Sequence, residues 1–125
     1  MMGRSTIWRG LSAAAAVGML IMATGCHSYH VETTIVNQTG EAVRQIEVDY
    51  PNASFGEDSL VAGAEAHYRI QLQGIGPLKV VYTSSNGHMN QIEGPVVAEH
   101  QEGSLQIVLL PGGKAEFHPQ LSARP

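Results

Sequence analysis

Cysteine is almost absent from this chain, which has a single one, Cys26, among its 125 residues. No intramolecular disulfide can form, so the fold depends on an apolar core and on backbone hydrogen bonds. Tryptophan is equally scarce, because Trp8 is the sole copy and precedes Cys26. The Cys…Trp…Cys pattern of antibody domains is therefore missing.

Basic residues are also few. From Cys26 onward, eleven Asp and Glu residues stand against only five Lys and Arg, which gives a net charge of −6. The five are Arg44, Arg69, Lys79, Lys114 and Arg124. An acidic chain repels phosphate backbones and anionic head groups. We therefore expect neither nucleic-acid binding nor charge-driven membrane binding.

Long hydrophobic runs are missing too, with one short exception near the N-terminus. Leu11–Met22 is uncharged and apolar, but a membrane-spanning helix needs about 20 such residues. Arg4 and Arg9 precede this stretch without any acidic residue, and Ala23-Thr24-Gly25-Cys26 follows it. A basic start, a short apolar stretch and small residues before a cleavage point are typical of a secretory signal peptide.

The segment that ends in Cys26 resembles the lipobox of bacterial lipoproteins. Gly25 and Thr24 match the pattern, whereas Ala23 stands where leucine is usual. The resemblance implies that residues 1–25 are removed, that the Cys26 thiol receives a diacylglyceryl group and that the new amine is acylated. Two or three acyl chains anchor a protein stably, whereas one chain is marginal.

The residue after Cys26 bears on where the lipoprotein would reside. It is His27, whereas an aspartate there would favour retention in the inner membrane. In a Gram-negative host the resemblance therefore implies the periplasmic face of the outer membrane. The alternative is an ordinary signal peptide in which Cys26 is an unmodified thiol.

Beyond residue 30, apolar and polar residues alternate, which is typical of strands with one face on a core and one in water. No stretch there shows the spacing of an amphipathic helix. The strands that this pattern predicts are Val31–Val36, Val43–Tyr50, Ala66–Gln73, Leu78–Thr83 and Leu105–Leu109, with weaker ones at Ser59–Ala62 and Met89–Glu93 and an extra edge segment at Val96–Glu99.

Turn residues separate these segments. Asn37–Gly40 predicts a short hairpin loop between the first two strands, and Ser85–His88 contains the Asn-Gly pair of a type I′ turn. About seven short strands at this spacing predict an all-β fold, a small antiparallel immunoglobulin-like β-sandwich. A small open barrel is the alternative.

These expectations divide the chain into four parts. Residues 1–25 form the signal peptide, 26–30 a lipidated tether, 31–113 the sandwich and 114–125 a loose C-terminal tail. Four or five tether residues reach at most about 15 Å. We therefore expect the domain to lie close to the bilayer.

One segment is a candidate for binding. The predicted loop Tyr50–Asp58 carries Tyr50, Asn52 and Phe55, and loops on rigid sandwiches often hold binding residues. An exposed aromatic side chain can anchor a partner or stack on a sugar ring. The more common fate of a single loop phenylalanine is to fold back and close the open end of the sandwich, and this alternative stays open.

The histidines offer little prospect of a metal site. They lie at positions 27, 30, 67, 88, 100 and 118, and no spacing among them forces two imidazoles together on strands. His27 and His30 are the weak candidates for copper or zinc. The sequence contains no nucleophile elbow and no phosphate-binding glycine loop, so we expect no enzyme activity and no cofactor.

The leading expectation is a lipid-anchored, non-enzymatic accessory domain with a protein partner in the cell envelope. A small-ligand or carbohydrate-binding module is one alternative, and it requires an exposed Tyr50 and Phe55. A metal-binding lipoprotein is the other, and it requires His27 and His30 to converge with a third ligand.

Overall fold

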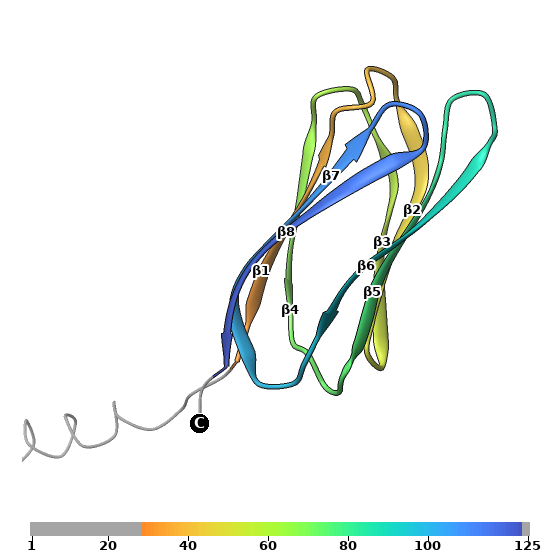
Figure 1. The fold of residues 1–125 in the computed structure, drawn as a ribbon. Coiled ribbons are helices and arrows are strands. Elements are labelled where there is room, and N and C mark those ends of the chain that lie inside the picture. The colour runs from red at the N-terminus through yellow and green to blue at the C-terminus, as the bar shows by residue number, and fades with distance from the viewer. Residues whose placement is uncertain (1–28, 124–125) are drawn as a thin grey trace, which may run out of the picture.

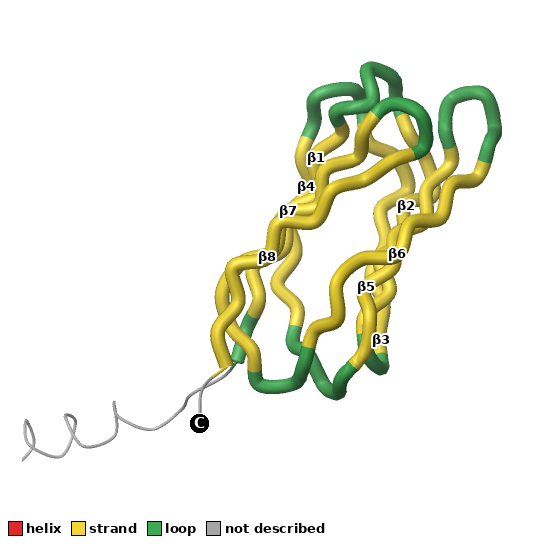
Figure 2. The backbone as a smooth tube through the Cα atoms, in the orientation of Figure 1, coloured by secondary structure: helices red, strands yellow, loops and turns green. Residues whose placement is uncertain are grey.

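The computed structural model describes residues 29–123, so the predicted signal peptide and Cys26 lie outside the described residues. Within them the chain forms strands and turns but no helix, and hence no helix able to cross a membrane (Figure 2). The strands are β1 (Val31–Asn37), β2 (Val43–Tyr50), β3 (Ala53–Leu60), β4 (Glu65–Ile70), β5 (Gly76–Thr83), β6 (Met89–Val97), β7 (Gln101–Leu110) and β8 (Lys114–Ala123).

The strands form a β-sandwich of two four-stranded sheets (Figure 1). Sheet A has the order β4-β1-β7-β8, and sheet B has the order β3-β2-β5-β6. All pairs are antiparallel except β1 and β7, which run parallel. The predicted all-β sandwich is confirmed. The immunoglobulin-like topology is not, because β1 lies between β4 and β7, whereas the first strand of a constant-type immunoglobulin sheet pairs with the second.

The core lies between the sheets and follows the predicted alternation. Fully or almost fully buried apolar side chains come from most of the predicted strands, with none from Met89–Glu93. They are Val31, Ile35, Val43, Ile46, Val48, Leu60, Ile70, Leu72, Leu78, Val80, Tyr82, Val97, Leu105, Ile107 and Leu109. Burial of this apolar surface is the main stabilising contribution in a domain that has no disulfide.

The sandwich has two opposite ends, which we name by the path of the chain. The entry end is where Val31 begins β1, and it also holds the β2–β3 turn, the β4–β5 loop and the end of β8. The distal end holds the loops between β1 and β2, β3 and β4, β5 and β6, and β7 and β8. The described residues therefore begin and finish at the same end (Figure 1).

The predicted hairpin between the first two strands is wrong. β1 and β2 belong to different sheets, so residues 38–42 cross from sheet A to sheet B at the distal end. Asn37, which is fully buried, stabilises this crossing. Its Nδ2 donates hydrogen bonds to the carbonyls of Glu41 (2.7 Å) and Leu60 (2.9 Å), and its Oδ1 accepts them from the Thr39 amide and hydroxyl.

The predicted loose tail at 114–125 is also wrong, because residues 114–123 form β8 at the edge of sheet A. Ala115, Phe117 and Leu121 alternate along it and pack against the core. Pro119 lacks an amide hydrogen, but an edge strand has one side without strand partners, so it tolerates proline. The folded domain therefore extends at least to Ala123.

Candidate functional site

The predicted binding loop Tyr50–Asp58 is a hairpin with a tight turn instead of a loop. β2 ends at Tyr50 and β3 begins at Ala53, so only Pro51 and Asn52 form the turn. Asn52 has a φ of 69°, and its side-chain amide donates to the carbonyl of Gln73 in the β4–β5 loop. Asn52 therefore links the β2–β3 turn to the β4–β5 loop at the entry end.

Tyr50 and Phe55 are half-buried and pack against the core. Their ring centroids are 6.1 Å apart, and Phe55 lies 4.3 Å from the ring of Tyr68 on β4. These three aromatic residues close the side of the sandwich where the edge strands of the two sheets meet. The contacts support the interpretation in which Phe55 folds back onto the sandwich.

A polar link between the sheets accompanies this aromatic cluster. The Tyr68 hydroxyl lies within hydrogen-bond reach of the Glu57 carboxylate and of the Gly56 carbonyl (3.0 Å). Burial first, and then the bond to Glu57 and its negative charge, raise the pKa of Tyr68 to about 12 from 10.0. The neutral phenol is therefore favoured in the folded protein.

Tyr68→Phe should make the stability of the protein less dependent on alkaline pH. A phenol with a raised pKa contributes stability that is complete below pH 10 and is lost as the pH rises towards 12. The melting temperature, measured between pH 9 and about 12, should therefore fall less steeply with pH for the variant than for the wild type. Tyr50→Phe is the matched control, because it leaves the Tyr68–Glu57 bond in place. Equal slopes for the two variants would contradict this account.

Glu47 and Asp49 lie on the outer face of sheet B, as the alternation along β2 predicts. The pKa of Glu47 is raised, first because its protonated carboxyl can donate a hydrogen bond to Asp49 and then because of the negative charge of Asp49. Lys79 on β5 lies 3.4 Å from the Asp49 carboxylate. Glu47 and Asp49 lie on an open sheet face that does not exclude water. We therefore interpret them as ordinary solvated surface residues.

One histidine makes contacts that resemble a catalytic constellation. The Thr34 hydroxyl lies 3.2 Å from Nδ1 of His67, and Nε2 of His67 lies 3.5 Å from the Glu65 carboxylate. The His67 and Glu65 side chains are 69% and 51% exposed on the outer face of sheet A. No wall around them excludes water, and exclusion of water is what makes such a group effective in catalysis.

Of the two candidate metal ligands, His27 and His30, the structure describes only His30. His27 lies outside the described residues, and the carbonyl of His30 accepts a hydrogen bond from Gly103 (3.2 Å). Among residues 29–123, no three His, Cys, Asp or Glu side chains gather in a way that could hold a metal ion. Because His27 lies outside these residues, the metal-binding alternative stays a prediction.

A pocket of about 210 Å³ opens at the distal end, and the sequence did not predict it. Its lining comes from three connections that are distant in sequence, together with the ends of the strands beside them. The lining residues are Thr39, Glu41, Val43, Tyr82, Ser84, Ser85, Leu110, Pro111, Gly112 and Gly113. Ser85 belongs to the predicted Ser85–His88 turn, but nothing in the sequence showed that this turn meets the other two connections.

Tyr82 links the sheets beside this pocket. It lies on β5 in sheet B, and its hydroxyl donates to the Lys114 carbonyl (3.2 Å) next to the β7–β8 turn of sheet A. Burial raises the pKa of its phenol. On the open side, the Ser85 hydroxyl donates to the Glu41 carboxylate, and the Ser84 hydroxyl accepts from Asn90 (2.7 Å).

Exposed large hydrophobic side chains concentrate at the two ends of the sandwich. Val61 and Met89 lie at the distal end and are 65% and 66% exposed. Ile75 and Val96 lie at the entry end and are 76% and 66% exposed. Sequence reasoning missed these four residues, because single aliphatic residues in loops or at strand ends look like ordinary members of the apolar pattern.

Comparison with known proteins shows the fold alone. No protein-family model matches this chain, and no curated protein matches it significantly. A solved NMR structure of a protein from Eubacterium rectale superimposes with a TM-score of 0.55 at 13% sequence identity. The match covers 77% of this chain and 95% of that chain. The fold therefore also occurs in a protein that shares little of this sequence.

Proposed function

We propose that this protein is a lipid-anchored accessory domain of the bacterial cell envelope, without enzymatic activity. The observation that carries the proposal is the run Ala23-Thr24-Gly25-Cys26 behind a basic start and a short apolar stretch. It also accounts for the only cysteine of the chain, which would be consumed by the lipid. In a Gram-negative host the protein would face the periplasm from the outer membrane.

The partner of this domain would be another envelope protein, which would meet the distal end. Two features support this choice. The distal end lies opposite the point where the chain comes from Cys26. It also presents the exposed side chains of Val61 and Met89 near the two edges of sheet B, and a partner that covered this end would bury both.

Cys26→Ala should move the protein from the membrane fraction to the soluble fraction of the envelope. The acyl chains contribute about 0.8 kcal/mol for each buried CH₂, and without the thiol none can be attached. Cell fractionation with an epitope at the C-terminus measures this, and mass spectrometry of the N-terminal peptide reports the lipid. Undiminished membrane association of the variant would contradict the proposal.

A photo-crosslinking amino acid at Val61 or Met89 should capture one defined envelope protein in living cells. Gln106 is the matched control, because it is exposed on the outer face of β7, away from the distal loops. The adduct should form from the distal positions, not from the control, and it should weaken when Cys26→Ala removes the anchor. Equal labelling from all positions would contradict a partner at the distal end.

The distal pocket favours a second candidate, a module that binds a small polar ligand. Its open side presents the Ser85 hydroxyl and the Glu41 carboxylate, which suit hydroxyl or amine groups. This candidate differs from the original carbohydrate-binding alternative, because Tyr50 and Phe55 take no part in it. NMR titration with simple sugars and amino acids would test it, and unchanged amide shifts at Gly112 and Gly113 would contradict it.

A further inference from the structure

We propose that the entry end of the sandwich rests on the lipid surface and contacts it through an apolar patch formed by Ile75, Pro77 and Val96. The inference rests on the lipid anchor at Cys26 that is proposed above. It adds a second, non-covalent contact with the membrane, which would fix how the domain stands on the bilayer.

The three patch residues are neighbours, although they come from two strands and a loop. Pro77 and Val96 are paired in register on β5 and β6, so their side chains share the outer face of sheet B. Ile75 is the last residue of the β4–β5 loop, two positions before Pro77, and is the most exposed of the four exposed large hydrophobic residues. Pro77 and Val96 are exposed as well.

The loop that carries Ile75 is held in place by contacts with the folded domain. Leu72 anchors its first half in the core, where it is 3% exposed. The Asn52 side chain donates to the Gln73 carbonyl, and Pro51 lies beside Gly74 and Gly76. A loop fixed at both ends presents Ile75 outward without having to be ordered on binding, which lowers the entropic cost of docking.

The length of the chain between Cys26 and the domain favours the bilayer as the occupant of the patch. Tyr29 already belongs to the folded part, since its ring lies 4.9 Å from that of His100 and Gly103 binds the His30 carbonyl. Only His27 and Ser28 separate it from Cys26, a span of roughly 10 Å at most. A gap of this size has no room for another folded domain.

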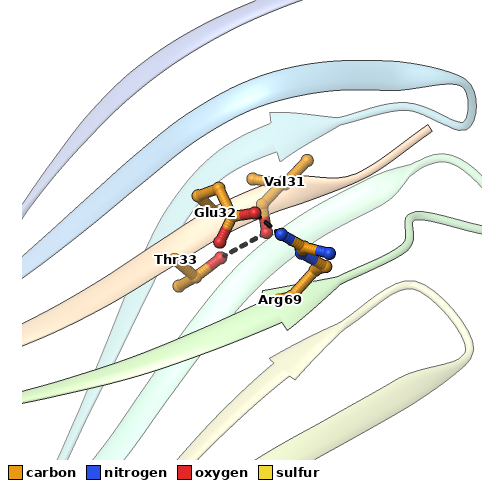
Figure 3. Close-up of polar contacts among 4 residues, drawn as sticks. All are labelled: Val31, Glu32, Thr33 and Arg69. Atoms are coloured by element: carbon orange, nitrogen blue, oxygen red, sulfur yellow. Dashed lines mark hydrogen bonds and ion pairs between the residues drawn. The ribbon is translucent and has the colours of Figure 1, made fainter. Parts of the chain in front are cut away.

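The charges at this end suit a neutral lipid surface. Residues 71–77 contain no charged side chain, so contact with head groups would bury no ion. On sheet A, the nearby Arg69 donates to Glu32 across β4 and β1 at 2.8 Å, which pairs the two charges (Figure 3). Glu99 beyond β6 is exposed, so we expect docking on zwitterionic lipid and weaker docking on anionic lipid.

The test uses single tryptophan residues as depth probes. In a Trp8→Phe background the chain contains no other tryptophan, so Ile75→Trp and Val61→Trp each report from one end of the sandwich. Each full-length variant is expressed in bacteria, purified from the membrane fraction and reconstituted into phosphatidylcholine vesicles with or without brominated acyl chains. Circular dichroism checks that both variants keep the wild-type fold.

The expected result is a blue-shifted emission and strong quenching for the Ile75→Trp variant, with neither effect for the Val61→Trp variant. Bromine near the head groups should quench more than bromine deep in the chains, since interfacial side chains penetrate only about 5–10 Å. Equal quenching at the two positions, or none at position 75, overturns the docking and leaves the anchor intact. Absence of the unaltered protein from the membrane fraction overturns the anchor, and the docking with it.

Discussion

Asn37→Ala should lower the free energy of unfolding by about 3 kcal/mol, because a buried acceptor or donor that loses its partner costs about 1–3 kcal/mol. The side chain is fully buried and serves the Glu41 and Leu60 carbonyls as well as the Thr39 amide. Thermal or urea unfolding should therefore show a melting temperature lower by about 12–24 °C.

Two further substitutions separate the role of this hydrogen-bond network from a general loss of an asparagine. Asn86→Ala removes an exposed turn side chain that accepts one bond from the His88 amide, so it should cost far less. Asn37→Asp keeps the acceptor for Thr39 but places a carboxylate against two carbonyl oxygens. Its stability should improve as the pH falls and the carboxyl group becomes neutral. A stable Asn37→Ala variant would mean that water replaces these bonds.

Ile107→Ala should destabilise the domain by about 3 kcal/mol, within the range for large-to-small substitutions in a rigid core. Ile107 has no solvent exposure and lies in the centre of sheet A. Its neighbours in register are Ile35 on β1 and Phe117 on β8. These strands hold the backbone on both sides, so the surroundings cannot collapse easily into the cavity.

The same substitution at Ile75 is the matched control. Ile75 is 76% exposed, so its truncation should leave the free energy of unfolding within about 0.5 kcal/mol of the wild type. Chemical denaturation of both variants measures the difference directly. Similar losses at the two positions would mean that Ile75 packs against the domain, and the lipid-docking patch would lose its outward-facing residue.

The sequence predicted the strands whose two faces differ clearly in polarity. β2 has the predicted bounds Val43–Tyr50, although a bulge at Gln45 interrupts its pairing with β5. A turn forms at Ser85–His88 as predicted, with backbone bonds from the Ser84 amide to the His88 carbonyl and from the Gly87 amide to the Ser84 carbonyl. It is not the predicted type I′ turn, because Gly87 has a positive φ of 85° but Asn86 does not have a positive φ. In these segments the local preference and the tertiary environment agree.

The strands that sequence reasoning missed or placed wrongly carry polar residues where the pattern requires apolar ones. In β3, Glu57 points inward and is accommodated by its contact with the Tyr68 hydroxyl. In β8, Pro119 stands between Phe117 and Leu121 at a position where the alternation requires an apolar strand residue. In each case the strand forms because of its contacts with a neighbouring strand, and the local sequence does not show these contacts.

The candidate sites were less predictable than the fold. The proposed lipidation of Cys26 rests on a local motif, which a single stretch of sequence contains. The distal pocket depends on three loops meeting, and the patch at the entry end depends on the β5–β6 register that sets Pro77 beside Val96. Neither arrangement has a signature in a single stretch of sequence.

The parallel pairing of β1 with β7 has a consequence for the time course of folding. Val31 pairs with Gly103 and Asn37 with Leu109, so the first strand gains this neighbour only when nearly the whole chain is present. Such non-local pairing gives a high contact order, and domains of this kind fold in milliseconds to seconds. A chain that emerges N-terminus first would leave one side of β1 unpaired until β7 follows, and truncations before residue 101 should fail to fold.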